Sequence, residues 1–499
     1  MKIMKWILIA TPLILLQGHQ LMAQSQYGET LYYEDALRFS QHPNTGSARI
    51  SGLGGTQNAL GGDISNIHGN PAGLGFFQKS EFSFTAAYTD WNAHTQFLNQ
   101  PTDHHTTNFS LPNLGAIFSR AKAPLEVGDW RGGAFGISIN RQSSYNHQYG
   151  YVANSPNEGS VLNFYADLFE AVGVEGAIPT EALYFDAFLI NPSNNGYNIS
   201  PNATGQLVIN ESVENEGNMT QVSFSYGGNF KNKFFLGASL GINTLTSRST
   251  KTYEETFSNS SGSNPNLFSS LQQNLFLDGS GINLGLGVIY KPLDELNLGL
   301  NFKSPSWIRV NDEYDADIIA DFNPPYQDPV EGTIPDSNVE TDVFVGSYTL
   351  RTPMKIGAGL TYFFEKKGFI TADANYLDYS TAHLRSNSFN PSQDNADIDA
   401  SYGKTINYSV GGELRHKIFR LRAGYAYYGD PFRDSSNLDR SSTQITGGLG
   451  VKLSGFSLDF GLVSNNFNSK QFALNDPSPN PAITENQLIS GMVTLGFSF

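Results

Sequence analysis

The chain has 499 residues, no cysteine, and 46 acidic against 30 basic side chains, which gives a formal net charge of −16 at pH 7. This charge argues against nucleic acid as a partner, and the lack of cysteine excludes disulfides, thiolate metal sites and a lipid-modified N-terminal cysteine. The mean hydropathy of −0.30 suits a soluble protein, but a transmembrane barrel has a similar average because only every second strand residue faces lipid.

Residues 1–23 are predicted to form a secretory signal peptide. Lys2 and Lys5 precede an apolar run over 6–16, and Ala23 marks the expected cleavage site. The apolar run is about half the length that a membrane-spanning helix needs. We therefore expect an exported protein without a helical membrane anchor. Residues 32–41 have a separate, helix-like pattern and are expected to form a short helix.

The stretch 46–84 reads GSARISGLGGTQNALGGDISNIHGNPAGLGFFQKSEFSF. The density of glycine in its first part predicts a compact segment that turns often and approaches other backbone closely. Pro71 fixes its own φ and favours an extended conformation for Asn70. From Phe82 onward apolar and polar residues alternate, as in a strand. A compact plug therefore runs directly into the first strand.

Fourteen segments have the alternation of β-strands, with one apolar or aromatic face and one small, polar or charged face. Lumen charges such as Asp373, Glu413, Arg420, Arg422 and Asp459 are expected to pair inside the barrel. The strands are predicted at 81–91, 107–119, 132–151, 218–230, 233–252, 277–291, 294–310, 341–364, 368–380, 404–417, 418–430, 442–455, 456–468 and 488–499.

The links between these strands alternate between tight turns and long loops, apart from the link at 120–131, which is longer than the other turns. The main long loops are expected at 152–217, 253–276 and 311–340. Short periplasmic turns and long outer loops are typical of an outer-membrane barrel. The sequence therefore predicts an all-β fold, a 14-stranded antiparallel transmembrane barrel over 81–499. The last predicted strand ends on Phe499, and a terminal aromatic residue on an alternating strand resembles the recognition signal of the barrel-assembly machinery.

The plug resembles the N-terminal hatch of the FadL-like family, the FadL and TodX type of outer-membrane transporters for long-chain fatty acids and aromatic hydrocarbons. The resemblance implies a hatch over 24–80 inside the lumen and passive uptake of hydrophobic molecules, which leave sideways through the barrel wall. It implies a gating role for Asn70, Pro71, Ala72, Gly61 and Gly62. The matching residues are Ser51-Gly52-Leu53-Gly54, Ala59-Leu60-Gly61-Gly62-Asp63 and Asn70-Pro71-Ala72.

The loop 152–217 contains apolar residues at helical spacing, followed by a second apolar group. Exposed apolar patches of this size mark binding surfaces. One interpretation is a substrate-capture groove at the barrel mouth, and the other is a loop that packs on itself or closes the barrel. The candidate capture residues are Phe164, Leu168, Phe169, Phe185 and Phe188.

No catalytic, metal or cofactor site is expected. The loop 311–340 is rich in carboxylates but lacks EF-hand spacing, so a solvated acidic loop is favoured over a calcium site. The pair His104-His105 has too few companion ligands for a metal or haem site. No serine-nucleophile elbow, phosphate loop or zinc motif is present.

The resulting hypothesis is a monomeric outer-membrane channel, not an enzyme, whose partners are hydrophobic small molecules, membrane lipid and, during biogenesis, the barrel-assembly machinery. A secretion-system accessory barrel that binds proteins is the alternative. An outer-membrane enzyme such as a phospholipase and a soluble extracellular β-protein are weaker rivals. The pattern leaves open which compound is carried and where the wall opens.

Overall fold

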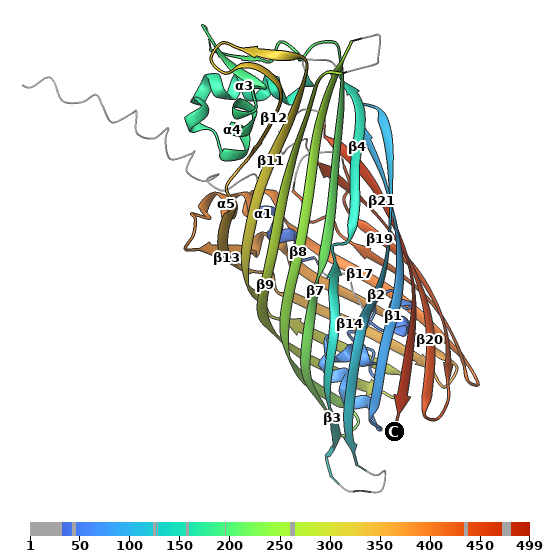
Figure 1. The fold of residues 1–499 in the computed structure, drawn as a ribbon. Coiled ribbons are helices and arrows are strands. Elements are labelled where there is room, and N and C mark those ends of the chain that lie inside the picture. Colours follow the sequence, from blue (N-terminus) through green and yellow to red (C-terminus); the bar gives the residue numbers. More distant parts are fainter. Residues whose placement is uncertain are drawn as a thin grey trace, which may run out of the picture.

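The computed structural model describes residues 32–41, 46–122, 126, 128–155, 159–194, 196–259, 265–433, 438–471 and 481–499. The predicted signal peptide lies outside these residues. The described chain forms a long, oblique barrel that is taller on one side than on the other (Figure 1). Within the described residues, no helix is long and apolar enough to cross a membrane.

The barrel is a closed circuit of antiparallel strands, in which the last strand pairs with the first. This confirms the predicted 14-stranded antiparallel barrel. The circuit runs through β1(Glu81–Phe97), β2(Gln100–Ala121), β3(Trp130–Ser144), β7(Gln206–Phe230), β8(Phe234–Ser258), β9(Pro265–Leu293), β10(Leu296–Lys303), β14(Lys355–Phe364), β15(Gly368–Asp378), β17(Lys404–His416), β18(Phe419–Tyr428), β19(Ser442–Lys452), β20(Phe456–Gln471) and β21(Ala482–Ser498).

Further strands extend one side of the barrel. The far half of β9 leaves β10 and pairs with β11 instead. Helices α3 and α4 lie near this extension. We use the name tower for the extended strands together with these two helices. Its elements, with those beside it, are β4(His147–Ser155), α3(Val161–Val172), η4(Val174–Gly176), α4(Pro179–Asp186), β5(Ile190–Ser193), β6(Gly196–Ile199), β11(Trp307–Asp328), β12(Gly332–Glu340), β13(Phe344–Arg351), η5(Tyr379–Thr381), β16(His383–Ser386) and α5(Ser392–Ser401).

The predicted loops 253–276 and 311–340 are largely strands, so the sequence placed the strand ends too early. The β8–β9 ladder continues to Ser258 and Pro265, and 311–340 forms most of the β11–β12 hairpin. The loop 152–217 contains α3, α4, the β5–β6 hairpin and the first part of β7. Strand pairing satisfies the backbone N–H and C=O groups in water as well as in lipid. The strand ladders can therefore continue beyond the membrane-spanning part of the barrel.

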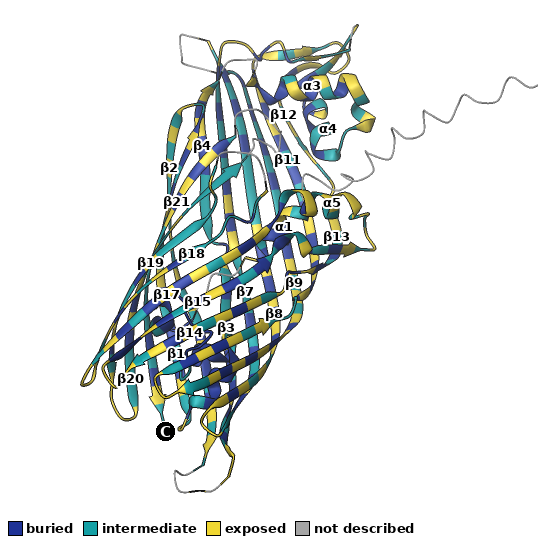
Figure 2. Cartoon of the chain, turned by 180° about the vertical axis from the view of Figure 1, so that it is seen from behind, coloured by how far each residue is buried: buried dark blue, intermediate teal, exposed yellow. Residues whose placement is uncertain are grey.

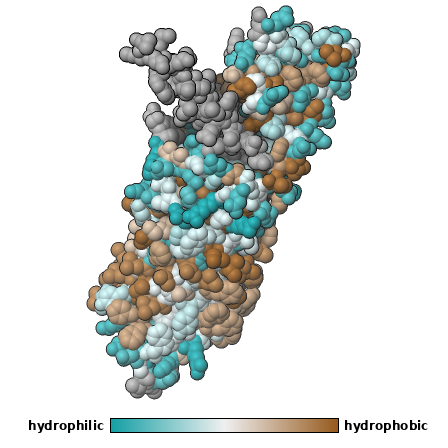
Figure 3. Space-filling view, turned by 90° about the vertical axis from the view of Figure 1, so that its left-hand side faces the viewer, coloured by the Kyte–Doolittle hydropathy of each residue, from teal (hydrophilic) through white to brown (hydrophobic). Residues whose placement is uncertain are grey.

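On the face shown in Figure 3, exposed apolar side chains form a belt over the lower half of the barrel, below a more polar zone. Leu298 and Leu300 on β10 are 42% and 61% exposed, as the predicted outward row requires. A closed barrel with such a belt satisfies its backbone internally and presents apolar groups to lipid. The barrel therefore spans a membrane. Other members of the belt are Leu236, Leu240, Leu284, Leu286, Leu360, Ile370, Leu421, Leu449 and Phe460.

The hatch occupies the lower lumen and is almost completely buried (Figure 2). It contains α2(Ala48–Ser51), η1(Ile64–Ile67) and η2(Pro71–Phe76), whereas α1(Tyr32–Arg38) lies higher. Where the hatch meets the wall, the strands present glycine. A Cβ at Gly299 would overlap the carbonyl oxygen of Asn58, and one at Gly287 would overlap the side chain of Asn70. This glycine girdle comprises Gly227, Gly237, Gly287, Gly299, Gly411 and Gly424.

The tower has an apolar core inside the curved sheet. Helices α3 and α4 bury Leu162, Phe169 and Leu183 against inward residues of β7, β8, β9 and β11, such as Phe257 and Ile318. A second cluster joins α1 to β11, β13 and α5 at middle height. The hatch therefore fills the lower lumen, and the tower helices fill the upper part.

Candidate functional site

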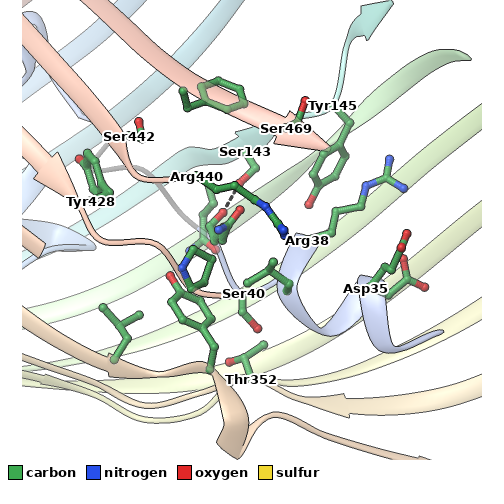
Figure 4. A pocket seen from close by; sticks show the side chains of 18 of the residues that line it. Asp35, Arg38, Ser40, Ser143, Tyr145, Thr352, Tyr428, Arg440, Ser442 and Ser469 are labelled. Carbon is green, nitrogen blue, oxygen red and sulfur yellow. Dashed lines mark hydrogen bonds between the residues drawn. The ribbon is translucent and has the colours of Figure 1, made fainter. Parts of the chain in front are cut away.

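A cavity of about 1150 Å³ lies between the hatch and the tower. Its floor includes Gln57, Asn58 and His68 of the hatch, and α1 forms part of its side. The cavity extends to Arg440, just before β19, whose side chain points toward the cavity (Figure 4). In the same view, Arg38 of α1 lies beside Tyr145. The barrel interior therefore holds a large space that is lined in part by the hatch.

Helix α1 is fixed to the cavity wall by three side-chain hydrogen bonds. The Tyr32 hydroxyl donates to Asp312 at 2.9 Å, the Tyr348 hydroxyl donates to Asp35 at 2.7 Å, and Arg38 donates to Ser247 at 2.7 Å. The helix thus lies against β8, β11 and β13 and narrows the cavity.

Two lysines face the cavity from adjacent strands. Lys303 of β10 and Lys355 of β14 are direct partners in the strand register, and both line the cavity. Lys303 donates to Gln221 at 3.1 Å. Like charges on directly opposed strand positions cost stability, and the buried carboxylate of Asp373 interacts electrostatically with Lys355. The sequence analysis did not single out either lysine.

The wall beside these lysines is interrupted in two adjacent strands. Residues 304–306 separate β10 from β11, and residues 352–354 separate β13 from β14. Each segment contains a proline, Pro305 or Pro353, which supplies no backbone donor to the ladder. Ser306 and Thr352 still bridge the gap, because the Ser306 N–H donates to Thr352 Oγ1 at 2.9 Å and the Thr352 N–H to Ser306 O at 3.0 Å.

We call these two segments the wall break, and four of their residues line the cavity. The sequence analysis placed unbroken strands over 294–310 and 341–364. The proline inside each strand pattern could have located the break, because a proline within an alternating run argues against an uninterrupted central strand.

The predicted gating residues come together at the contact between the hatch and the wall. Asn70 is fully buried, donates to Asn58 O at 2.5 Å and to Leu300 O at 3.3 Å, and accepts from the Ala72 N–H at 3.1 Å. Pro71 is the first residue of η2. Gly62 has a φ of +73° and donates to Gly73 O, and a Cβ at Gly61 would overlap the Phe76 ring.

A buried ion-pair network also holds the hatch. Arg422 lies 2.8 Å from Glu413 and 2.6 Å from Asp459, and all three are on the inner face of the barrel. Arg49 of the hatch lies 3.5 Å from Glu413 and 3.4 Å from Asp63. Three of the five expected lumen charges therefore pair here, and an arginine of the hatch completes the network. Asp373 instead accepts backbone N–H groups of the hatch, and Arg420 donates to backbone carbonyl oxygens near the β17–β18 turn.

The five candidate capture residues lie on α3, near the end of α4 and just after α4, but they do not share one surface. Phe169 is 1% exposed in the tower core, and Leu168 packs against that core. Phe164 is 39% exposed. Phe185 and Phe188 line a second groove of about 540 Å³ together with the β11–β12 hairpin. The groove also contains Asp186, Asn191, Pro192, Asp328, Val330, Glu331 and Ile334.

Helix α3 begins on a buried carboxylate of β8. Glu255 accepts from Ser160 Oγ at 2.6 Å and from the Val161 N–H at 2.8 Å. Burial raises the pKa of Glu255 to about 7, despite these hydrogen bonds. The first turn of α3 is therefore anchored to a carboxyl group that titrates near neutrality.

The acidic residues of 311–340 mostly lie on the outer face of β11 and on β12, as a solvated acidic segment would. Among the described residues, no group of three or more His, Cys, Asp or Glu side chains is placed to hold a metal ion. His105 of the predicted pair lies 2.8 Å from Asp90 on the exposed face of β2.

No family model and no curated protein matches this chain. Solved structures do match it along most of its length. The toluene transporter TodX of P. putida covers 92% of this chain and 99% of its own, with 13% identity and a TM-score of 0.52. A Pseudomonas aeruginosa FadL homologue covers 90% and 98%, with 14% identity and a TM-score of 0.53.

The toluene transporter TbuX of Ralstonia pickettii covers 92% of this chain and 99% of its own, with 12% identity and a TM-score of 0.50. At such low identity a likeness carries the fold and not the substrate. The chain therefore has the same barrel fold as the FadL homologue and the two toluene transporters.

Proposed function

We propose that this protein is an outer-membrane channel, and not an enzyme, for passive uptake of hydrophobic small molecules such as long-chain fatty acids or similar compounds. The observation that carries the proposal is the cavity of about 1150 Å³, which the hatch lines in part and which the wall break borders. Three proteins of the same fold are a FadL homologue and two toluene transporters. The channel acts as a monomer and is inserted into the membrane by the barrel-assembly machinery.

Capture begins in the tower. Phe185 and Phe188 border the second groove, and the other three candidates support it from α3. An apolar solute that binds there removes aromatic surface from water. It then moves down into the cavity.

Exit is sideways through the wall break. The hatch blocks the direct path along the barrel axis, and an apolar solute gains nothing by entering water below it. At the wall break two prolines weaken the ladder between cavity and lipid. Movement of the hatch near Asn70 and Pro71 gates this path, because Asn70 bonds to Leu300 on β10, four residues before the wall break.

A reversible cross-link across the wall break tests the exit route. The natural chain has no cysteine, so S306C with T352C would create a single pair at positions that already bond to each other. In proteoliposomes, oxidation should strongly reduce uptake of a labelled fatty acid, and reduction should restore it.

The matched control is T361C with T371C, a directly opposed pair on β14 and β15 whose hydroxyls lie 2.8 Å apart. Oxidation of this pair should leave uptake unchanged. Full uptake through a verified S306C–T352C cross-link would rule out exit at the wall break. Absence of uptake in the natural protein would rule out the transport function.

A secretion-system accessory barrel remains the alternative function. It would use the outer surface of the tower to bind a protein and would not need the cavity. Specific saturable binding of a small hydrophobic compound inside the cavity supports the channel.

A further inference from the structure

The second groove lies on the tower, between the end of α4 and the β11–β12 hairpin, and the capture path proposed above begins there. Its volume of about 540 Å³ is in the range of sites for small organic ligands. An apolar surface of this kind binds hydrophobic compounds of any charge, so the polar residues beside it decide which of them it prefers. Five of the nine lining residues are apolar, namely Phe185, Phe188, Pro192, Val330 and Ile334.

All charged side chains that line this groove are carboxylates, those of Asp186, Asp328 and Glu331. Asp328 accepts the backbone N–H groups of Val330 and Glu331, both at 2.8 Å, which fixes its position in the hairpin turn without changing its charge. Asp186 is the last residue of α4, where the helix dipole adds a partial negative charge. Within the described part of the chain, none of the three carboxylates forms an ion pair.

The chain segments around the groove supply no compensating positive charge. Residues 142–230, which include α3 and α4, and residues 310–350, which include β12 and most of β11, contain no lysine or arginine. Lys251 of β8 lies 3.7 Å from Glu211 and lines the larger cavity instead of the groove. Arg248 of the same strand lies over the ring of Phe276. A cation that approaches the tower is therefore attracted to the groove, and an anion is repelled.

Two aromatic rings lie in the same groove as the carboxylates. Phe188 follows the cap of α4 with a φ of +60°, a left-handed conformation that glycine most often occupies at this position. Its carbonyl oxygen accepts the side-chain N–H of Asn191 at 2.9 Å, which holds this backbone in place. Phe185 packs edge-on against Tyr197, with 6.2 Å between the ring centres. The faces of such rings attract organic cations, and carboxylates beside them strengthen the attraction.

We propose that this groove selects apolar organic cations, namely amines with a hydrocarbon ring or chain, over neutral compounds of the same shape and over carboxylates. The ammonium group lies beside Asp186, Asp328 and Glu331, and the hydrocarbon part contacts Phe185 and Phe188. A fatty-acid anion in the same position would meet three like charges. This inference rests on the proposed capture role of the groove and names the class of hydrophobic compound that the tower collects.

Three probes of similar size and different charge test this selection. At pH 7, 4-phenylbutylamine is a cation, 4-phenylbutan-1-ol is neutral and 4-phenylbutyrate is an anion. Binding to the purified full-length protein in phosphatidylcholine nanodiscs is measured by isothermal titration calorimetry, with empty nanodiscs as the blank. At low salt we expect the amine to bind about fivefold more tightly than the alcohol, and the carboxylate to bind most weakly, because exposed charge contacts and cation–π contacts are each modest. The preference should shrink at high salt, since salt screens exposed charges.

A double variant assigns the preference to its residues. Asp186→Asn with Glu331→Gln keeps the shape of both side chains and removes their charge, so the affinity for the amine should fall to that for the alcohol. The matched control is Glu313→Gln with Glu340→Gln, which removes two charges from exposed positions of β11 and β12 outside the groove and should retain the preference. If the double variant no longer binds the alcohol, Glu331→Gln alone replaces it, because Glu331 is exposed in the hairpin turn, and it should reduce the preference.

The outcomes separate this inference from the channel function. Equal or tighter binding of the carboxylate, or an unchanged preference for the amine in the folded variant, overturns the inference. Binding of tetralysine without binding of the amine would assign the groove to a basic protein partner and also overturns it. A preference for the amine that depends on Asp186 and Glu331, without uptake of any probe into proteoliposomes, supports the inference and rejects transport. Uptake of the alcohol without any preference for the amine keeps the channel and rejects the inference.

Discussion

On strand β8, the apolar residues lie on the outward face in the lower half of the barrel and on the inward face in the upper half. In its lower half, Leu236, Leu240 and Ile242 point outward, and Gly237 points inward against the hatch. In its upper half, Tyr253 and Phe257 point inward and form the tower core. The side on which apolar residues lie thus changes along one continuous strand.

The change follows the solvent on each side. Lipid surrounds the lower half, so large apolar residues face out, and the hatch leaves room for little but glycine inside. Water surrounds the upper half, so the apolar residues turn inward, as in a soluble sheet. The lower half is consequently held by close backbone contact and buried ion pairs, and the upper half by packing of large side chains. The predictions below test this difference, from the largest expected effect to the smallest.

The glycine girdle should tolerate no side chain where the hatch meets it. Gly299→Val would place a Cβ on the carbonyl oxygen of Asn58, so we expect the hatch to be displaced and small solutes to leak. Conductance in planar bilayers measures the leak, and heat-modifiable gel migration checks the barrel. Gly491→Val is the control, since a Cβ there meets nothing within 4 Å. A sealed Gly299→Val channel would show that the hatch is loosely seated.

The buried ion-pair network should cost far more to break than an exposed pair. Arg422→Met leaves the buried Asp459 without its arginine partner and removes one of the three arginines around Glu413, which keeps Arg415 and Arg49, and we expect a loss of about 3–5 kcal/mol in unfolding free energy. Lys231→Met breaks an exposed pair with Asp129 and should cost about 0–1 kcal/mol. Urea unfolding in lipid vesicles measures both. Equal losses would mean that the network does not stabilise the lower half.

The hatch triplet should control passage without supporting the barrel. Asn70→Ala with Pro71→Gly removes the bonds to Asn58 and Leu300 and loosens η2. We expect reduced uptake of hydrophobic substrate, or a leak of small solutes, in a barrel that still assembles, because the wall strands do not include these residues. Uptake and leak are measured in the same proteoliposomes. Natural uptake without a leak would assign the triplet a purely structural role.

The stability of helix α3 in the tower should depend on pH through the carboxyl group of Glu255. Its pKa of about 7 in the folded state lies above the usual value of about 4.3 for glutamate. A raised carboxyl pKa contributes stability that is fully present below the unfolded value and is lost as the pH rises through the folded one. Protection of the α3 amides against hydrogen exchange, corrected for the intrinsic rate, should therefore fall between pH 5 and pH 8.

Glu255→Gln should remove this pH dependence, because glutamine stays neutral throughout the range. Glu254→Gln, one residue away with its side chain on the other face of β8, should keep it. A pH dependence that persists in Glu255→Gln would place the titrating group elsewhere.

The smallest effect is expected at the capture groove. Phe188→Ser should weaken binding of a hydrophobic probe to the tower by roughly threefold, because part of one ring is lost from the groove. Phe164→Ser should have less effect, since Phe164 lies outside that groove. Uptake at low substrate concentration measures both. The reverse order would move the capture site to the exposed face of α3.

The sequence alone determined the number of strands, their outward apolar rows and the position of the hatch. Alternation with period two depends on local chain geometry, and the Leu298 and Leu300 row is visible without knowledge of any neighbour. The predicted start of the first strand at Glu81 was correct for the same reason. The residue pattern changes sharply at that position.

Only the tertiary structure decided where the strands end and what the cavity is. Along β9 the same face stays inward, but the apolar residues move from outward positions such as Leu284 to inward ones such as Leu267 and Leu271, and a change of this kind looks like a loop until the helices that cover it are placed. Lys303 and Lys355 are far apart in the sequence and meet because two strands pair. The cavity and its charge arise from such long-range pairings, which no local pattern encodes.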